Sequence, residues 1–252
     1  MIPPTSIDGT DITGATIDGT DVQEITVDGD VVFSAAPQIP VSGLLHDYDA
    51  TQESYTDGAT GETFNDQKGA NDGVATGTTF RTSGLNGNPS FEYDGSNDRH
   101  TLNRISLGSG DEATVAAVVD VDAIQLQAIF ANNSEVGSTR GFWVGIDPNG
   151  KWTAQFPAGS ANLIGAAASS GTAIVLFSTD GNDGFLEVDG IVEASASISI
   201  NNSNKQNAFI GTLRPGTGQF IGQIGQVLYY DEFKNSSERS DIYSGLANKW
   251  GL

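Results

Sequence analysis

The chain has 252 residues, of which 32 are acidic and 11 are basic, so its formal net charge is −21. Phosphate recognition needs clustered lysine and arginine, and this charge therefore excludes a nucleic-acid binder. The chain has no cysteine and only two histidines, His46 and His100. This excludes disulfides, thiolate metal sites and a cysteine nucleophile, and it nearly excludes multi-histidine zinc sites and Ser-His-Asp chemistry.

The acidic excess is strongest at the start of the sequence, where no lysine or arginine precedes Lys68. Such self-repulsion is costly at low salt and is screened at molar salt, because the Debye length falls from about 10 Å at 0.1 M to about 3 Å at 1 M. The charge pattern therefore predicts a protein of a salt-adapted organism. The alternative is an ordinary acidic secreted protein.

Residues 1–36 contain a repeat with a period of ten. The segment Ile7-Asp8-Gly9-Thr10-Asp11-Ile12 recurs at residues 17–22 and, in weaker form, at residues 27–31. Each unit has β-branched residues on both sides of Asp-Gly, which predicts a hairpin. These strands are too short for a core of their own, so we expect an arm that lies on another surface or on copies of itself. The alternative is a flexible acidic tail. The residues expected to anchor or oligomerise the arm are Ile7, Ile12, Ile17, Val22, Val27 and Val31.

Two prolines in residues 37–40 indicate a linker and a domain boundary. The 32 glycines and the frequent short apolar runs after residue 41 then predict an all-β domain. Strands are expected at residues 114–119, 141–146, 151–156, 173–177, 185–188, 191–194 and 226–230. Their regular spacing favours a sandwich or jelly roll. Near the C-terminus, Ser236 or Ser237 is expected to cap a short helix in which Ile242, Leu246 and Trp250 recur every four residues.

We expect no secretory signal and no membrane insertion. The first residues carry no cationic segment followed by an apolar run, and no stretch approaches the roughly 20 apolar residues that span a bilayer.

Five segments then occur in a characteristic order: FNDQKGAND at 64–72, LNGNPSFEYDGSND at 85–98, LEVDG at 186–190, GQIGQVLYYD at 222–231, and Ser237-Glu238-Arg239 leading to Lys249-Trp250-Gly251-Leu252. Over about residues 41–252 this set resembles the concanavalin A-like superfamily, and in particular laminin G-like jelly-roll domains. The resemblance implies two packed antiparallel sheets with a curved concave face. Members mostly bind glycans or partner proteins, and they occur in secreted adhesins and in tail or surface proteins of tailed viruses. The arm at residues 1–36 also resembles N-terminal segments of virus tail proteins.

Glycan binding would use aromatic rings that stack on sugars and polar groups that bond to hydroxyls. Trp143 and Trp152 lie on strands expected to pair beside a turn. Their expected polar companions are Tyr93, Asn132, Asn133 and Arg140. The alternative is that both tryptophans belong to the core.

No cofactor is required, although hard oxygen ligands for Ca²⁺ or Mg²⁺ are plentiful. The candidate metal ligands are Asp94, Asn97 and Asp98 in one loop, and Asp180 and Asp183 in another. The alternative is ordinary turn chemistry, because Asn, Asp and Gly cluster in turns.

Some members of the superfamily are glycoside hydrolases with alternating carboxylates on one strand. Glu187, Asp189 and Glu193 come close to that pattern. However, Asp189-Gly190 is expected to be a hairpin turn, which moves Glu193 to the next strand and lengthens the spacing. We therefore expect no enzyme.

These observations predict a structural protein of a tailed virus of a halophilic host: a tail fibre, baseplate or capsid-surface spike on the virion surface. Residues 41–252 would face a host-surface glycan or glycoprotein. The arm would bind other virion proteins and itself, with a homotrimer favoured and a pentamer as the alternative. A second hypothesis is a glycan-binding module of a cellular secreted or surface protein, and a third is a glycoside hydrolase.

Overall fold

The computed structural model describes residues 38–132, 141–156, 162–200 and 207–252, together with six short strands between Ser6 and Ser34. The chain divides into two compact units, Met1–Gln38 and Ile39–Leu252. Within the described residues, no helix is long and apolar enough to cross a membrane.

The N-terminal unit contains three antiparallel hairpins. Their strands are β1 (Ser6–Ile7) with β2 (Thr10–Asp11), β3 (Thr16–Ile17) with β4 (Thr20–Asp21), and β5 (Glu24–Val27) with β6 (Asp30–Ser34). Ile7 pairs with Thr10 and Ile17 pairs with Thr20, so the first two hairpins share one register with an offset of ten residues. The hairpins predicted from the repeat are confirmed. Ile7, Ile17, Val27 and Val31 lie in these strands, whereas Ile12 and Val22 lie outside the described residues.

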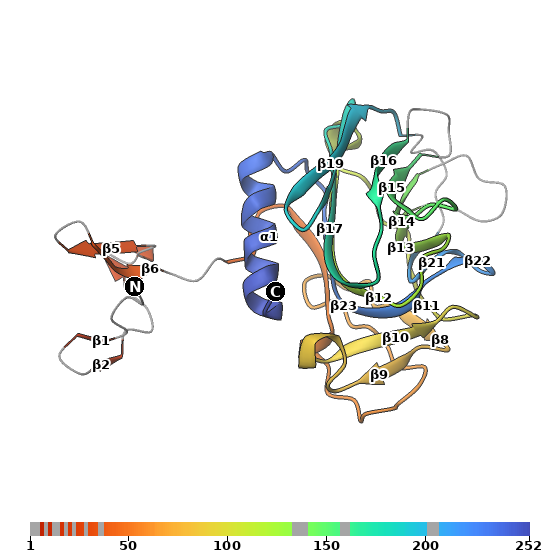
Figure 1. Ribbon diagram of the computed structural model, residues 1–252, viewed down its shortest axis with the longest axis horizontal. Helices are drawn as coiled ribbons and strands as arrows, with labels where there is room; N and C mark the ends of the chain where they lie inside the picture. The colour runs from red at the N-terminus through yellow and green to blue at the C-terminus, as the bar shows by residue number, and fades with distance from the viewer. Residues whose placement is uncertain are drawn as a thin grey trace. The chain divides into compact units, whose positions relative to one another are not determined.

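The C-terminal unit is an all-β sandwich of two antiparallel sheets with one helix (Figure 1). We call the sheet beside the helix the first sheet; its strand order is β19-β18-β17-β12-β23-β10-β9, and β7 also pairs with β23. Its strands are β7 (Leu44–Asp49), β9 (Thr79–Arg81), β10 (Ser90–Asp94), β12 (Ala113–Val121), β17 (Gly171–Thr179), β18 (Asp183–Val188), β19 (Ile191–Ser197) and β23 (Ile221–Tyr230).

The second sheet has the order β16-β15-β14-β13-β20-β11-β8. Its strands are β8 (Val74–Thr76), β11 (Arg99–Leu102), β13 (Gln127–Asn132), β14 (Phe142–Ile146), β15 (Lys151–Gln155), β16 (Leu163–Ala167) and β20 (Ala208–Ile210). A small hairpin follows β20, formed by β21 (Thr212–Arg214) and β22 (Thr217–Gln219). Three single 3₁₀ turns lie at Ala50–Gln52, Leu85–Gly87 and Ser109–Asp111. All seven strands expected after residue 41 are present.

The main core lies between the two sheets and is built from side chains that alternate inward along the strands. A second apolar cluster lies on the outer face of the first sheet, beneath α1 (Ser236–Trp250). Ile242, Leu246 and Trp250 of the helix are fully buried there, as their spacing predicts. Gly225 leaves the room for this contact, because a Cβ at that position would lie 2.3 Å from the Trp250 ring.

The helix begins one residue earlier than the expected caps. Asn235, and not Ser236 or Ser237, is the N-cap: its Oδ1 accepts hydrogen bonds from the backbone N–H groups of Ser237 (2.9 Å) and Glu238 (3.2 Å). The Glu238 carboxylate accepts in return from the Asn235 N–H at 2.9 Å, which completes a capping box. This local motif fixes where α1 starts relative to the first sheet.

Candidate functional site

The predicted aromatic site does not form one surface. Trp143 and Trp152 lie on the paired strands β14 and β15, but their side chains point to opposite faces of the second sheet. Trp152 is in the main core and Trp143 packs on the outer face against Ala131 and Leu213, and each is 4% exposed. The structure therefore corrects the stacking role that we expected, because neither ring is open to a sugar.

The predicted polar companions of the tryptophans do not gather around them either. Tyr93 is in the core, where its hydroxyl donates a hydrogen bond to His100 Nδ1 at 2.8 Å. Asn132 is also buried, and its amide nitrogen and oxygen have no hydrogen-bond partner among the described residues. Asn133 and Arg140 lie outside the described residues.

The candidate metal loops use their carboxylates to close turns. The Asp94 carboxylate accepts from the Ser96 N–H (2.7 Å), and the Asp98 carboxylate accepts from the Asp94 N–H (2.8 Å). Asn97 lies in the same turn, and its carbonyl accepts from Arg99. Among the described residues, no three His, Cys, Asp or Glu side chains gather closely enough to hold a metal ion.

The second candidate metal loop shows the same turn chemistry. Asp180 accepts from the N–H groups of Asn182 (2.9 Å) and Asp183 (2.7 Å), and these bonds lower its pKa. Asp183 in turn accepts from the Ser197 hydroxyl at 2.8 Å. Both loops thus favour the turn interpretation over an ion site.

A groove of about 380 Å³ lies between α1 and the β18–β19 hairpin. It is lined by Glu187, Asp189, Gly190, Val192, Ser236, Arg239, Ser240, Tyr243 and Ser244. The three serines recur every four residues, so they follow one face of the helix. Gly190 and Asp189 both have positive φ (75° and 51°) and form the hairpin turn predicted from Asp-Gly. A Cβ at Gly190 would lie 3.1 Å from the Tyr243 ring, so the hairpin tip approaches the helix closely.

A buried ion pair forms one wall of this groove. Arg239 Nε donates to Glu187 Oε1 at 2.6 Å, and the two side chains are 5% and 8% exposed. The guanidinium carbon of Arg239 lies 4.6 Å from the centre of the Phe185 ring. Its Nη1 donates to the Lys234 carbonyl at 2.9 Å. These contacts hold the guanidinium plane in one orientation beside the groove.

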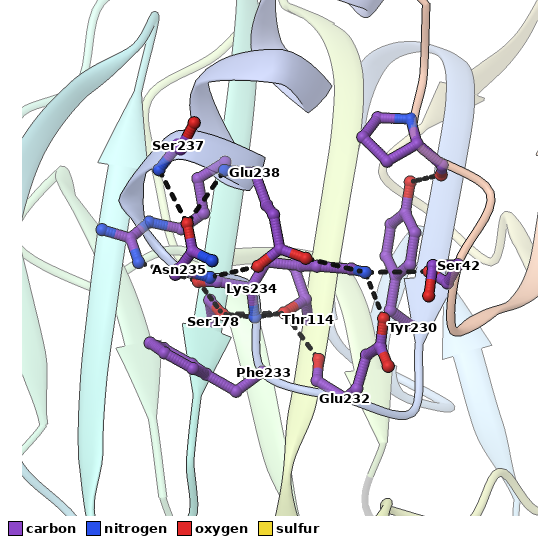
Figure 2. Close-up of polar contacts among 12 residues, drawn as sticks. Ser42, Thr114, Ser178, Tyr230, Glu232, Phe233, Lys234, Asn235, Ser237 and Glu238 are labelled. Carbon is purple, nitrogen blue, oxygen red and sulfur yellow. Dashed lines mark hydrogen bonds and ion pairs between the residues drawn. The ribbon is translucent and has the colours of Figure 1, made fainter. Parts of the chain in front are cut away.

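Lys234 fixes the start of the helix beneath that wall (Figure 2). Its side chain is fully buried; Nζ donates to the Ser42 carbonyl (2.8 Å) and to Glu232, and it lies 3.6 Å from a Glu238 carboxylate oxygen. Its backbone N–H reaches the Ser178 (3.0 Å) and Thr114 (3.2 Å) hydroxyls on the first sheet. These contacts join the start of the helix, and with it one side of the groove, to the first sheet.

The three carboxylates considered for catalysis point to different partners. Glu187 faces Arg239, the Asp189 carboxylate accepts from the Ile174 N–H at 2.9 Å, and the Glu193 carboxylate accepts from the Ala166 N–H of the second sheet at 2.7 Å. Two carboxyl groups that flank one sugar bond are needed for glycoside hydrolysis. Glu193 is not in the groove, and the two acids that line it are already hydrogen-bond acceptors.

The groove offers hydroxyls, carboxylate oxygens, guanidinium N–H groups and one tyrosine ring. This set suits a polyhydroxylated ligand, because each ligand hydroxyl can both donate and accept. Sequence reasoning missed most of these residues, since they come from segments about 50 residues apart. The one local signal was the spacing of Ser236, Ser240 and Ser244, which places hydroxyls along one side of an otherwise amphipathic helix.

No protein-family model matches the chain, and no curated protein sequence matches it. Among solved structures, the chain is similar to a Trypanosoma rangeli sialidase in complex with sialic acid (TM-score 0.62, 14% identity). The match covers 89% of this chain and 36% of the sialidase chain, so this chain spans about a third of that protein's length.

The chain is also similar to domain 4 of an extracellular arabinanase from Geobacillus stearothermophilus, solved with arabinotriose. Here the TM-score is 0.56 at 13% identity, and the match covers 79% of this chain and 98% of the domain. At these identities the likeness shows the fold alone, which is a β-sandwich.

Proposed function

We propose that the sandwich is a non-catalytic glycan-binding module of the concanavalin A-like, laminin G-like kind. The observation that carries the proposal is the groove between α1 and β18–β19, where hydroxyls, a tyrosine ring and an Arg–Glu pair converge. Its volume lies within the range of small-molecule sites, about 300–1,000 Å³. The sandwich likeness to an arabinanase domain solved with arabinotriose supports the same function.

The two carboxylates of the groove, Glu187 and Asp189, already accept hydrogen bonds from the protein, which supports binding rather than hydrolysis. A general acid must carry a proton to the leaving oxygen, and Glu187 instead accepts from Arg239 at 2.6 Å. The competing function is a glycoside hydrolase that uses Glu187 and Asp189, because both acids line one groove. Turnover of a glycan that disappears in a Glu187→Gln variant would favour that enzyme.

We further propose that the module is displayed on a virion surface of a tailed virus of a halophilic host, with a cell-surface or secreted location as the alternative. The support is the repeated hairpin arm, the net charge of −21 and the β-sandwich. The arm would bind other virion proteins and itself, with a homotrimer favoured over a pentamer.

Binding is tested on a glycan array, followed by titration calorimetry with the best ligand. A Ser240→Trp variant fills the groove and is expected to abolish binding. The matched control is Asn248→Trp, on the same helix but not in the groove lining, which should bind like the parent chain. Equal binding by both variants would contradict the groove as the site.

The arm is tested by light scattering in about 2–3 M KCl, where its charges are screened. The full chain is expected to be a closed oligomer, and a chain that begins at Ile39 is expected to be a monomer. A monomer in both forms would count against the virion role and favour the cellular module.

A further inference from the structure

A second hollow of about 350 Å³ lies on the same hairpin as the groove. Its lining residues are Asp183, Gly184, Phe185, Ser195, Ala196 and Ser197. The backbone at Gly184 and Ala196 forms its floor, because a Cβ at Gly184 would point at Leu163 and Ile198 of the main core, and Ala196 packs against the same core. The side chains of Asp183, Phe185, Ser195 and Ser197 stand around that floor.

The register of β18 and β19 places the two hollows in line. Asp183 pairs with Ser197, Phe185 with Ser195 and Glu187 with Val192. Since alternate residues of a strand share a face, the pairs follow one another along the outer face of the hairpin. Leu186, between them, points into the core. The six residues of β18 span about 20 Å at roughly 3.3 Å per residue.

Arg239 of the groove reaches towards the second hollow. Its guanidinium stacks on Phe185, which lines the second hollow, and donates to Glu187, which lines the groove. Phe185 also packs on Phe233, with ring centres 5.9 Å apart. The two hollows have no lining residue in common, but Arg239 of the groove contacts Phe185 of the second hollow directly, so they are neighbours on one face of the hairpin.

We propose that the groove and the second hollow form one trough for an extended, uncharged, linear oligosaccharide. This inference rests on the proposed glycan-binding function and adds its ligand class. A single pocket suits the end of a glycan, whereas two hollows in line along about 20 Å of one hairpin suit successive units of a chain.

The charge of the side chains that line the trough favours neutral over acidic oligosaccharides. Three carboxylates (Asp183, Glu187 and Asp189) and one guanidinium line the trough, within a chain of net charge −21. Uronate, sialate or sulfate groups would meet net repulsion there. Neutral hydroxyls instead find carboxylate and serine acceptors along the whole length.

The test is calorimetric titration of the full chain with neutral linear gluco-, xylo-, manno- and arabino-oligosaccharides of two to six units. For the best series, we expect affinity to rise at least tenfold from the disaccharide to the pentasaccharide. A Ser195→Trp variant should lose that gain and keep the disaccharide affinity, as should a second variant, Ser197→Tyr. Asn248→Trp is the control and should behave like the parent chain.

Three outcomes would overturn the inference in distinguishable ways. Binding that is equally tight for all lengths, and unaffected by Ser195→Trp and Ser197→Tyr, would refute the trough while the glycan-binding function stands. Equally tight binding of oligogalacturonate or sialyllactose would refute the neutral ligand class. Failure of every oligosaccharide to bind would refute the proposed function itself, and the trough with it.

Discussion

Protonation of His100 should couple the stability of the sandwich to pH. The imidazole is fully buried between the sheets; its Nδ1 accepts from the Tyr93 hydroxyl (2.8 Å), and its Nε2–H donates to the Glu62 carbonyl (3.2 Å). Burial lowers the pKa of His100 from 6.5 to about 3, and the bond to Glu62 opposes this only in part. The folded protein therefore keeps a neutral ring well into the acid range.

The direction in which stability changes with pH follows from proton uptake by the unfolded chain. Below pH 6.5 the unfolded chain binds a proton at His100 and the folded chain does not, so stability is complete above pH 6.5 and falls as the pH drops towards 3. Each pH unit in this window costs about 1.4 kcal/mol. Between pH 7.5 and pH 4.5 the loss is therefore about 2.7 kcal/mol.

The assay is urea unfolding in 2 M KCl from pH 7.5 to pH 4.5, for the parent chain and for His100→Gln. The variant should be less stable at neutral pH because its buried partners are mismatched. The other titrating groups are common to both proteins, so the difference between their unfolding free energies should shrink by about 2.7 kcal/mol towards pH 4.5. A constant difference across this range would refute the reasoning.

Three further predictions concern the helix and the surface charge. Arg239→Met leaves Glu187 buried without its ion-pair partner and should cost about 3–5 kcal/mol in urea unfolding, most of which the double variant with Glu187→Met should recover. Asn235→Ala removes the N-cap and should cost about 1 kcal/mol, measured by thermal unfolding; a cost matched by Ser237→Ala would contradict the cap assignment. Raising KCl from 0.1 to 2 M should raise the melting temperature through screening, and an unchanged value would count against salt adaptation.

Local patterns predicted the helix and seven of the fifteen strands that the structure describes in the two sheets. The apolar run at 114–119 became β12, and the spacing of Ile242, Leu246 and Trp250 identified the buried side of α1. The Asp189-Gly190 turn was also predictable, since positive φ at two successive positions strongly favours such a pair. These features depend on neighbours within a few residues of each other.

The site was much less predictable, because it depends on which face of a sheet is covered. Trp143 and Trp152 differ only in the phase of alternation along their strands, yet one lies in the core and the other under β21. The groove joins β18 to a helix about 50 residues later in the chain. No periodicity in either segment shows that β18 and the helix contact each other. The resemblance to a sandwich family predicted two packed sheets, but not which side chains meet between the elements.

The position of β7 has a mechanical consequence. If the arm holds the protein and a ligand occupies the hairpin β18–β19, tension enters through β7 and leaves through β18. It must then cross the ladders β7–β23, β23–β12, β12–β17 and β17–β18 in turn. The Lys234 bond to the Ser42 carbonyl and the Tyr230 bond to the Pro40 carbonyl brace the point where the load arrives. The ladder between β7 and β23 is therefore the first to bear a pull, and the central ladders behind it are loaded only for as long as it holds.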